Sequence, residues 1–263
     1  MKIERTIILN KKFFIIGILL IAIVTVTVIN IVSKNIPKEV EIKQNFSHVE
    51  VDTDNSDIIF IASKDKTAKV ELENSNNKYE LIANVHGDTL EVEIEHKWFR
   101  LFSFNFFSKT PKLVIYLPEN ISGTITAETA NGSIEADKLS AKEMTVETNN
   151  GEVYLSNLKV SSLYIESDNG EVFLENIDGK IVGESSNGDI SLVNDTLDQP
   201  VNLETNNGTI SIQTKNEPKN VTIEVETDNG EISIFGNANA KTVFGKGKEL
   251  VKLSSNNGDI IVE

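Results

Sequence analysis

The stretch that decides the fold is TITAETANGSIEAD, residues 124–137, which returns in a similar form as EMTVETNNGEVYLS at residues 143–156. The Asn-Gly dipeptide within it occurs seven times, with gaps of 19, 19, 18, 20, 22 and 28 residues, and Asn55-Ser56 is a degenerate eighth copy. A near-constant period of this length is typical of repeat architectures. We predict a structural turn at every copy: Asn131-Gly132, Asn150-Gly151, Asn169-Gly170, Asn187-Gly188, Asn207-Gly208, Asn229-Gly230 and Asn257-Gly258.

Apolar and polar residues alternate on both sides of the dipeptide, as they do in half-buried strands. The positions six and four before each Asn, and three and five after it, are apolar in every copy except at Gly183. Ser or Thr always stands two positions before the Asn. Each unit is therefore predicted to be a strand, a tight turn and a second strand. We expect the Asn-Gly turn to need positive φ, which both residues tolerate at low cost.

Two all-β architectures can use such a unit. It can be an antiparallel hairpin of a meander or sandwich, or one coil of a β-solenoid in which equivalent residues stack about 4.8 Å apart. The same residue types in the same slots favour the solenoid, which we predict for residues 121–263. Between residues 64 and 118 the dipeptide is absent, and AKVELE, YELIANV, TLEVEIE and KLVIYLP alternate. These segments predict an antiparallel N-terminal β cap within residues 45–120.

The N-terminus carries the pattern of a membrane anchor. Residues 13–32, FFIIGILLIAIVTVTVINIV, contain no charge, and a helix of this length reaches about 30 Å, the thickness of a bilayer core. We predict one transmembrane helix at residues 13–33, a cytoplasmic tail at 1–12 that holds four basic residues, a linker at 34–44, and an extracellular C-terminal domain. The alternative is a cleaved signal peptide that releases the same domain, although no A-x-A-like site follows the apolar run.

Composition excludes several classes of function. The net charge is −15, and because residues 1–33 hold four basic residues and one acidic residue, the rest of the chain carries −18. The exported part has a single arginine, Arg100, so no nucleic-acid partner is expected. The chain has no cysteine, which excludes disulfides, thiol catalysis and cysteine-ligated zinc. No cofactor is predicted.

The order of these motifs resembles a known family. An N-terminal anchor is followed by V-x-V-x-T-x-N at residues 49–55, L-x-I-x-L-P at residues 113–118, and a ladder of T-x-N-G-x-I-x-I units. This arrangement is similar to the LiaG-like bacterial "putative adhesins" over about residues 45–263. The resemblance implies a cell-envelope protein of Gram-positive type, sometimes linked to envelope stress, with no catalytic residues to carry over.

No catalytic constellation is visible in the sequence. The three histidines, His48, His86 and His96, lie outside the regular ladder, and no H-x-x-x-H, G-x-S-x-G or phosphate-loop spacing occurs. Enzymatic β-solenoids that cleave acidic polysaccharides also need basic groups or a metal. We therefore predict that the protein is not an enzyme and assign no catalytic residues.

Acidic residues recur at two outward positions of the repeat, three before and two after each Asn, and a solenoid would stack them into two stripes. Like charges about 5 Å apart in water cost on the order of 1 kcal/mol per pair, which the fold tolerates. One interpretation is a solvated face that keeps the protein soluble and blocks edge pairing. The other is a surface for divalent cations or a cationic polymer, although EF-hand and calcium-repeat spacings are absent. The first stripe holds Asp52, Glu128, Glu147, Glu166, Glu184, Glu204 and Glu226, and the second holds Asp57, Glu152, Glu171, Asp189, Glu231 and Asp259.

Residues 97–109, KWFRLFSFNFFSK, are the one place where this acidic chain becomes basic and aromatic. The segment is either a cap over an open end of the core or an exposed patch that contacts the membrane or a partner. Its candidate residues are Trp98, Phe99, Arg100, Phe102, Phe104, Phe106 and Phe107.

Taken together, these features predict a membrane-anchored, non-enzymatic surface module that contacts an envelope polymer or a membrane protein. A self-assembling envelope scaffold is the alternative, because residues 260–263 end the chain on a strand with no evident cap. A carbohydrate-active enzyme ranks last.

Overall fold

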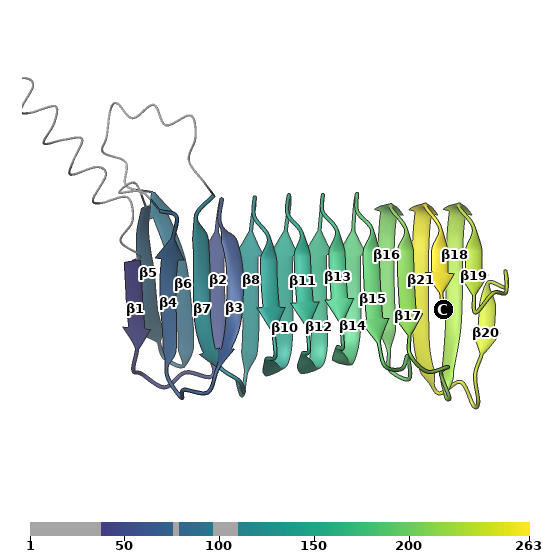
Figure 1. Ribbon diagram of the computed structural model, residues 1–263, viewed down its shortest axis with the longest axis horizontal. Coiled ribbons are helices and arrows are strands. Elements are labelled where there is room, and N and C mark those ends of the chain that lie inside the picture. Colours follow the sequence, from purple (N-terminus) through teal and green to yellow (C-terminus); the bar gives the residue numbers. More distant parts are fainter. Residues whose placement is uncertain (1–37, 76–78, 97–109) are drawn as a thin grey trace, which may run out of the picture.

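The computed structural model describes residues 38–75, 79–96 and 110–263. The predicted tail and transmembrane helix, residues 34–37 of the linker, and the aromatic segment 97–109 lie outside these ranges. Within them the chain is all-β, as predicted, and contains no helix that could span a membrane. The described strands form two long sheets that lie along the same axis (Figure 1).

Each sheet has eleven strands within the described ranges. The first sheet runs, in spatial order, β1 (Lys38–Ile42), β4 (Ala68–Glu73), β7 (Lys112–Pro118), β3 (Asp57–Ser63), β9 (Ile134–Asp137), β11 (Val153–Ser156), β13 (Val172–Glu175), β15 (Ile190–Asn194), β17 (Ile210–Thr214), β22 (Ile260–Val262) and β19 (Ile232–Ile234). The second runs β20 (Lys241–Val243), β18 (Val221–Asn229), β21 (Glu249–Asn257), β16 (Val201–Asn207), β14 (Asp178–Ser185), β12 (Lys159–Ser167), β10 (Ser140–Thr148), β8 (Thr124–Thr129), β2 (His48–Thr53), β6 (Thr89–His96) and β5 (Tyr79–His86).

Successive units are coils and not hairpins. The strand before each Asn-Gly lies in the second sheet, the strand after it lies in the first sheet, and neighbouring coils pair in parallel. For example, β10 pairs with β8 and β12 on its two sides, and β11 pairs with β9 and β13. The architecture is therefore a β-helix-like solenoid.

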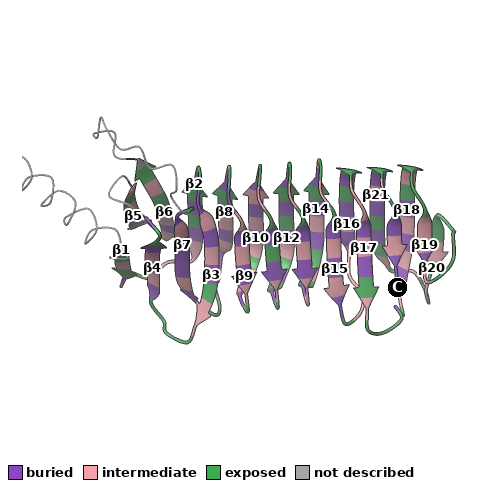
Figure 2. Ribbon diagram, turned by 45° about the horizontal axis from the view of Figure 1, so that its top comes forward, coloured by how far each residue is buried: buried purple, intermediate pink, exposed green. Residues whose placement is uncertain are grey.

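The core consists of the apolar slots of the repeat. Ile125, Ala127, Ile134 and Ala136 of one coil are at most 3% exposed, and buried residues alternate with more exposed ones along strands such as β8 and β9. The banded colours of Figure 2 show the same alternation along the solenoid. Fully burying a Val, Leu or Ile side chain contributes about 1.5–3 kcal/mol, so stacked coils gain stability without disulfides. Where Gly183 interrupts the pattern, Leu203 of the next coil fills the space: a Cβ at Gly183 would lie 2.9 Å from Leu203 Cδ2.

The predicted reason for glycine in the Asn-Gly turn is wrong. None of the seven glycines, all of them in the described ranges, has positive φ. A Cβ at Gly170 would instead overlap the carbonyl oxygen of Gly151 in the preceding coil. At each of the other six glycines, a Cβ would likewise overlap a backbone carbonyl oxygen of the adjacent coil. Positive φ occurs in the opposite turn, at Lys138 (59°), Asn157 (54°) and Asn176 (52°). Glycine is thus needed for close backbone stacking.

The N-terminal region contains the expected antiparallel pairs but is more than a cover. Strand β4 pairs antiparallel with β1 and β7, and β5 pairs antiparallel with β6. However, β6 and β7 also pair in parallel with β2 and β3, so they add a further coil that continues both sheets. One core cluster runs from Ile42 to Val262 through the described residues.

The last two coils are stacked in the reverse of their sequence order, because the final coil is inserted before the one that precedes it in the chain. Strands β21 and β22, which come last in sequence order among the described strands, lie between β16 and β17 on one side and β18 and β19 on the other, as Figure 1 shows for β21. The expectation that residues 260–263 form an uncapped edge is therefore wrong. The long final gap between Asn-Gly copies is explained by β20, which pairs antiparallel with the outer side of β18.

Candidate functional site

The asparagines of the repeat form a continuous ladder along one edge of the solenoid. Each Nδ2 donates to the Oδ1 of the neighbouring coil's asparagine at 2.9–3.1 Å. Most also donate to a backbone carbonyl of that coil at 3.3–3.4 Å, for instance Asn150 to Ala130. The spatial order is Asn55, Asn131, Asn150, Asn169, Asn187, Asn207, Asn257 and Asn229.

The hydroxyl two residues before the Asn has a related structural role. Thr148 Oγ1 donates to the carbonyl of Gly132 at 3.1 Å, and Thr205 and Ser255 donate in the same way to glycines of the coils below them. The buried hydroxyls of Ser167 and Ser185 have no partner within the described residues. These slots stabilise the turn and present nothing to a ligand.

The first acidic stripe is in register on the outer face of the second sheet. Glu147 lies beside Glu128 and Glu166, and the row continues through Glu184 and Glu204. Asp52 extends the row to Glu93, which sequence reasoning missed because β6 lacks the Asn-Gly signature. Ser254 separates the row from Glu226.

Burial and neighbouring negative charges both disfavour ionisation of Glu128, a member of this row. Burial, and then the charges of Glu147, Asp52 and Glu50, raise the pKa of Glu128 above its ordinary value. Part of the row borders a shallow groove of about 280 Å³ that also contacts Tyr164. No group of three or more acidic or histidine side chains in the described ranges is placed to hold a metal ion.

The second acidic stripe is partly structural. The Oδ1 atoms of Asp57, Asp189 and Asp259 each accept a backbone N–H of the adjacent coil, at 3.1, 2.7 and 2.8 Å. Aspartate therefore joins coils at these three positions. The glutamates at the other positions of the stripe are longer and reach outward: Glu152 accepts the hydroxyl of Tyr154 at 2.6 Å.

A groove of about 380 Å³ crosses β3, β9 and β11 on the outer face of the first sheet. Ile61 and Tyr154, which are 38% and 40% exposed, lie on its two sides. The half-buried Glu135 is in register with Ile59 on one side and with Tyr154 on the other, whereas Ile61 is in register with Asp137, two residues further along β9. The groove thus has apolar sides and a carboxylate between them.

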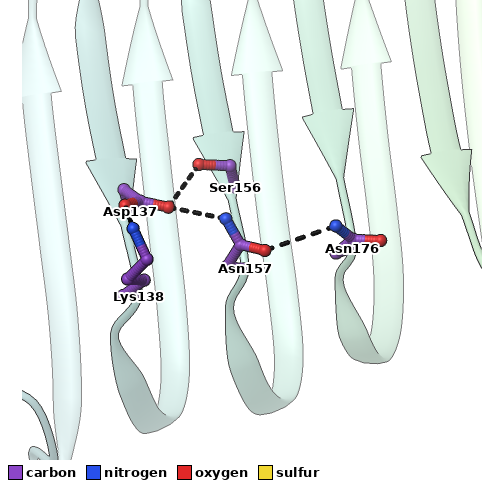
Figure 3. A network of polar contacts seen from close by, with 5 residues as sticks. All are labelled: Asp137, Lys138, Ser156, Asn157 and Asn176. Atoms are coloured by element: carbon purple, nitrogen blue, oxygen red, sulfur yellow. Dashed lines mark hydrogen bonds and ion pairs between the residues drawn. The ribbon is translucent and has the colours of Figure 1, made fainter.

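A polar network fixes one end of this groove (Figure 3). Asp137 Oδ1 accepts from Ser156 at 2.8 Å and from Asn157 at 2.7 Å, and Asp137 Oδ2 accepts from Lys138 at 2.7 Å. Asn176 in turn donates to Asn157 Oδ1 at 3.3 Å. Burial alone would raise the pKa of Asp137, but the hydrogen bonds from Lys138, Asn157 and Ser156 outweigh it and lower that pKa.

His48 joins three segments of the N-terminal region. Its Nδ1 lies 2.9 Å from Thr124 Oγ1, and its Nε2 lies 3.7 Å from Asp88 Oδ2. The hydroxyl of Thr124, the imidazole of His48 and the carboxylate of Asp88 therefore lie in series. The imidazole also packs closely against Gly123, where a Cβ would lie 2.7 Å from Cε1 of the ring. This arrangement is a clasp between β2, β8 and the turn after β5.

The groove residues Ile61, Glu135 and Tyr154 were not singled out from the sequence. They occupy outward-facing positions of their strands, whereas the repeat was recognised from the apolar residues at the inward-facing positions. An apolar residue in an outward slot was the available clue, and both Ile61 and Tyr154 supply it. The aromatic segment from Trp98 to Phe107 lies outside the described residues.

The chain matches one family model and is similar to several solved structures. A family model described as Toastrack DUF4097 matches residues 46–263. A "putative adhesin" from Bacteroides fragilis has a TM-score of 0.53 at 15% identity, over 88% of this chain and 97% of that one. A "putative cell adhesion protein" from Clostridium sporogenes has a TM-score of 0.39 at 17% identity, over 86% and 99%. A "putative lipid binding protein" from Parabacteroides distasonis has a TM-score of 0.49 at 17% identity, over 86% and 97%. No curated protein matches the chain.

Proposed function

The chain belongs to the Toastrack DUF4097 family, and we propose that it is a non-enzymatic surface module, anchored in the membrane by residues 13–33, that contacts an envelope polymer or a membrane protein. The observation that carries this proposal is the carboxylate row on the outer face of the second sheet. From Glu93 to Glu204 it presents one acidic side chain per coil.

Such a row suits a partner that is itself repetitive. Coils are stacked at the strand spacing of about 4.8 Å, so many equivalent groups contact one extended molecule at once. Individually weak contacts then add through effective concentration. The similar solved structure from Bacteroides fragilis is named a "putative adhesin", which supports contact with another surface as the role.

Two further elements complete the proposal. By the positive-inside rule, the four basic residues of the tail favour a cytoplasmic N-terminus and an extracellular solenoid. An anchor followed by this ladder is also the arrangement of the LiaG-like proteins, which supports an envelope location and a link to envelope stress.

A reporter fused after Glu263 should be active only outside the cell. Protease added to wall-stripped cells should degrade the solenoid and spare residues 1–12, and protection of the solenoid would show that the topology is inverted.

The binding test uses the full-length chain in proteoliposomes, mixed with isolated envelope polymers of the producing cell. We expect the polymers to sediment with these vesicles. A variant with Glu128, Glu147, Glu166 and Glu184 changed to Gln should retain less polymer. The matched control changes four acidic residues outside the row: Glu217, Asp228, Glu231 and Glu263. Equal retention by all three proteins would contradict the proposal, and turnover of the polymers would show an enzyme.

The structure removes the observation that suggested a self-assembling scaffold, which was an unpaired edge strand at residues 260–263. The terminal strand β22 is paired on both sides, and the outermost strands at that end, β19 and β20, have three residues each. Short edge strands resist pairing with other chains. A full-length chain that remains monomeric in detergent at high concentration would exclude the scaffold.

A further inference from the structure

We infer that the groove across β3, β9 and β11 binds an arginine side chain of a protein partner. The inference rests on the proposed function and deepens it by naming the chemistry of one contact. It uses a different face from the carboxylate row, because Glu135 lies in the first sheet and the row lies in the second.

The groove contains one carboxylate whose charge is not used within the described protein. Asp137 accepts from Lys138, Ser156 and Asn157, so the nearby ammonium is already engaged. Glu135 has no hydrogen-bond or ion-pair partner among the described residues, although it is half-buried between Ile59 and Tyr154. A partly buried carboxylate gains most from a partner that brings both a charge and hydrogen-bond donors.

The aromatic side of the groove is held in place and faces a negative potential. Tyr154 donates its hydroxyl to Glu152 Oε2 at 2.6 Å, which fixes the ring. That hydrogen bond, then burial, then the charges of Glu152, Glu171 and Glu135 raise the pKa of Tyr154. An exposed ring surrounded by three carboxylates attracts a cation to its face.

A guanidinium group matches these features together. Its planar fork donates two parallel N–H bonds to one carboxylate, here Glu135, and it stacks on an aromatic face, here Tyr154. Its three methylenes then lie against Ile61 on the other side. A lysine ammonium is compact and strongly hydrated and does not stack, while a neutral sugar leaves the charge of Glu135 uncompensated.

The test follows the Ile61 methyl resonance by NMR in the full-length chain, held in non-ionic detergent. The probe is the peptide acetyl-Gly-Arg-Gly-amide, titrated to a concentration on the order of 10 mM. We expect a saturable shift of the Ile61 methyl signal. The same peptide with citrulline, which has the shape of arginine but no charge, and the peptide with lysine should each bind about tenfold more weakly or not at all.

Two variants separate the groove from general charge attraction. Glu135→Gln should weaken arginine binding about tenfold, and Glu217→Gln, the same change at an exposed residue that belongs neither to the groove nor to the carboxylate row, should alter it less than about twofold. No Ile61 shift, equal binding of citrulline or lysine, or equal losses in the two variants would each overturn the inference. Thermal unfolding of both variants checks that they are folded. Polymer sedimentation depends on the row containing Glu128, so the proposed function can fail or succeed independently of this result.

Discussion

Asn229 donates its side-chain amide to Oδ1 of Asn257 at 3.1 Å, and Asn257 donates in turn to Oδ1 of Asn207 at 2.9 Å. The asparagine that comes last in the sequence therefore lies between two that precede it. The side chains of six of the seven Asn-Gly asparagines donate twice and accept once within this ladder. Among the described residues, the side chain of Asn229 makes only the single hydrogen bond to Asn257.

Because the Asn229 side chain makes fewer hydrogen bonds than the other ladder asparagines, we predict that it deamidates fastest. In deamidation the backbone nitrogen of Gly230 attacks Cγ of Asn229, ammonia leaves from Nδ2, and water opens the ring to aspartate or isoaspartate. In the other six asparagines, Nδ2 donates to the coil on one side and Oδ1 accepts from the coil on the other, which restrains the side chain. We therefore expect Asn229 to react first at pH 8. Peptide mapping by mass spectrometry measures the seven rates. In denaturant they should become similar, and faster reaction at Asn150 in the folded protein would contradict the prediction.

Close stacking predicts an order of stability for two glycine variants. Gly170→Ala places a Cβ on the carbonyl of Gly151 and should lower the free energy of unfolding by about 2–4 kcal/mol. Gly87→Ala has open space around it but a φ of +67°, and should cost about 1 kcal/mol. Chemical denaturation gives both values. A larger loss at Gly87 than at Gly170 would contradict the prediction that close backbone stacking is what makes glycine necessary in the ladder.

Two carboxyl groups should respond to pH in opposite ways. The pKa of Glu128 is raised on folding, so the folded state holds its proton more tightly and this group destabilises the protein once pH exceeds its folded pKa. Glu128→Gln should therefore raise the melting temperature at pH 7 and have less effect near pH 4. The pKa of Asp137 is lowered, so its contribution is present at neutral pH and is lost as pH falls through the folded pKa.

Asp137→Asn is the matched comparison, because it also removes one negative charge. It should lower the melting temperature at pH 7, and the difference from the parent should shrink as the solution is acidified. Melting curves at several pH values decide the matter. Shifts of the same sign for the two variants would show that net charge, and not local environment, controls stability.

Removing residues 249–263 should unfold more than the deleted coil. Strands β18 and β19 pair in parallel only with β21 and β22 within the described structure, so their inner neighbours disappear with the deletion. Hydrogen exchange should show lost protection over residues 221–243 and retained protection over residues 124–194. Retained protection over residues 221–234 would indicate that this coil can dock directly on β16 and β17.

The sequence predicted the coil but not the order of coils. Apolar slots such as Ile125 and Ile134 are dictated by strand periodicity, so the core and the two sheets follow from local pattern. The place of β21 depends on pairing between residues up to 50 apart, as with Asn207 and Asn257, and no local pattern encodes that choice. The groove was missed for a similar reason: Glu135, Ile61 and Tyr154 meet only when three coils stack.

The inserted final coil also constrains the timing of folding. When residues 221–234 have been synthesised, the slot beside β16 and β17 is still empty, and the strand that fills it in the finished molecule does not yet exist. Residues 221–234 have the same inward apolar pattern as residues 251–262, so both segments compete for one position. The nascent chain must either keep that position open or exchange an early occupant for the later one. Synthesis of residues 249–263, and not the growth of each preceding coil, is the event that fixes this part of the solenoid.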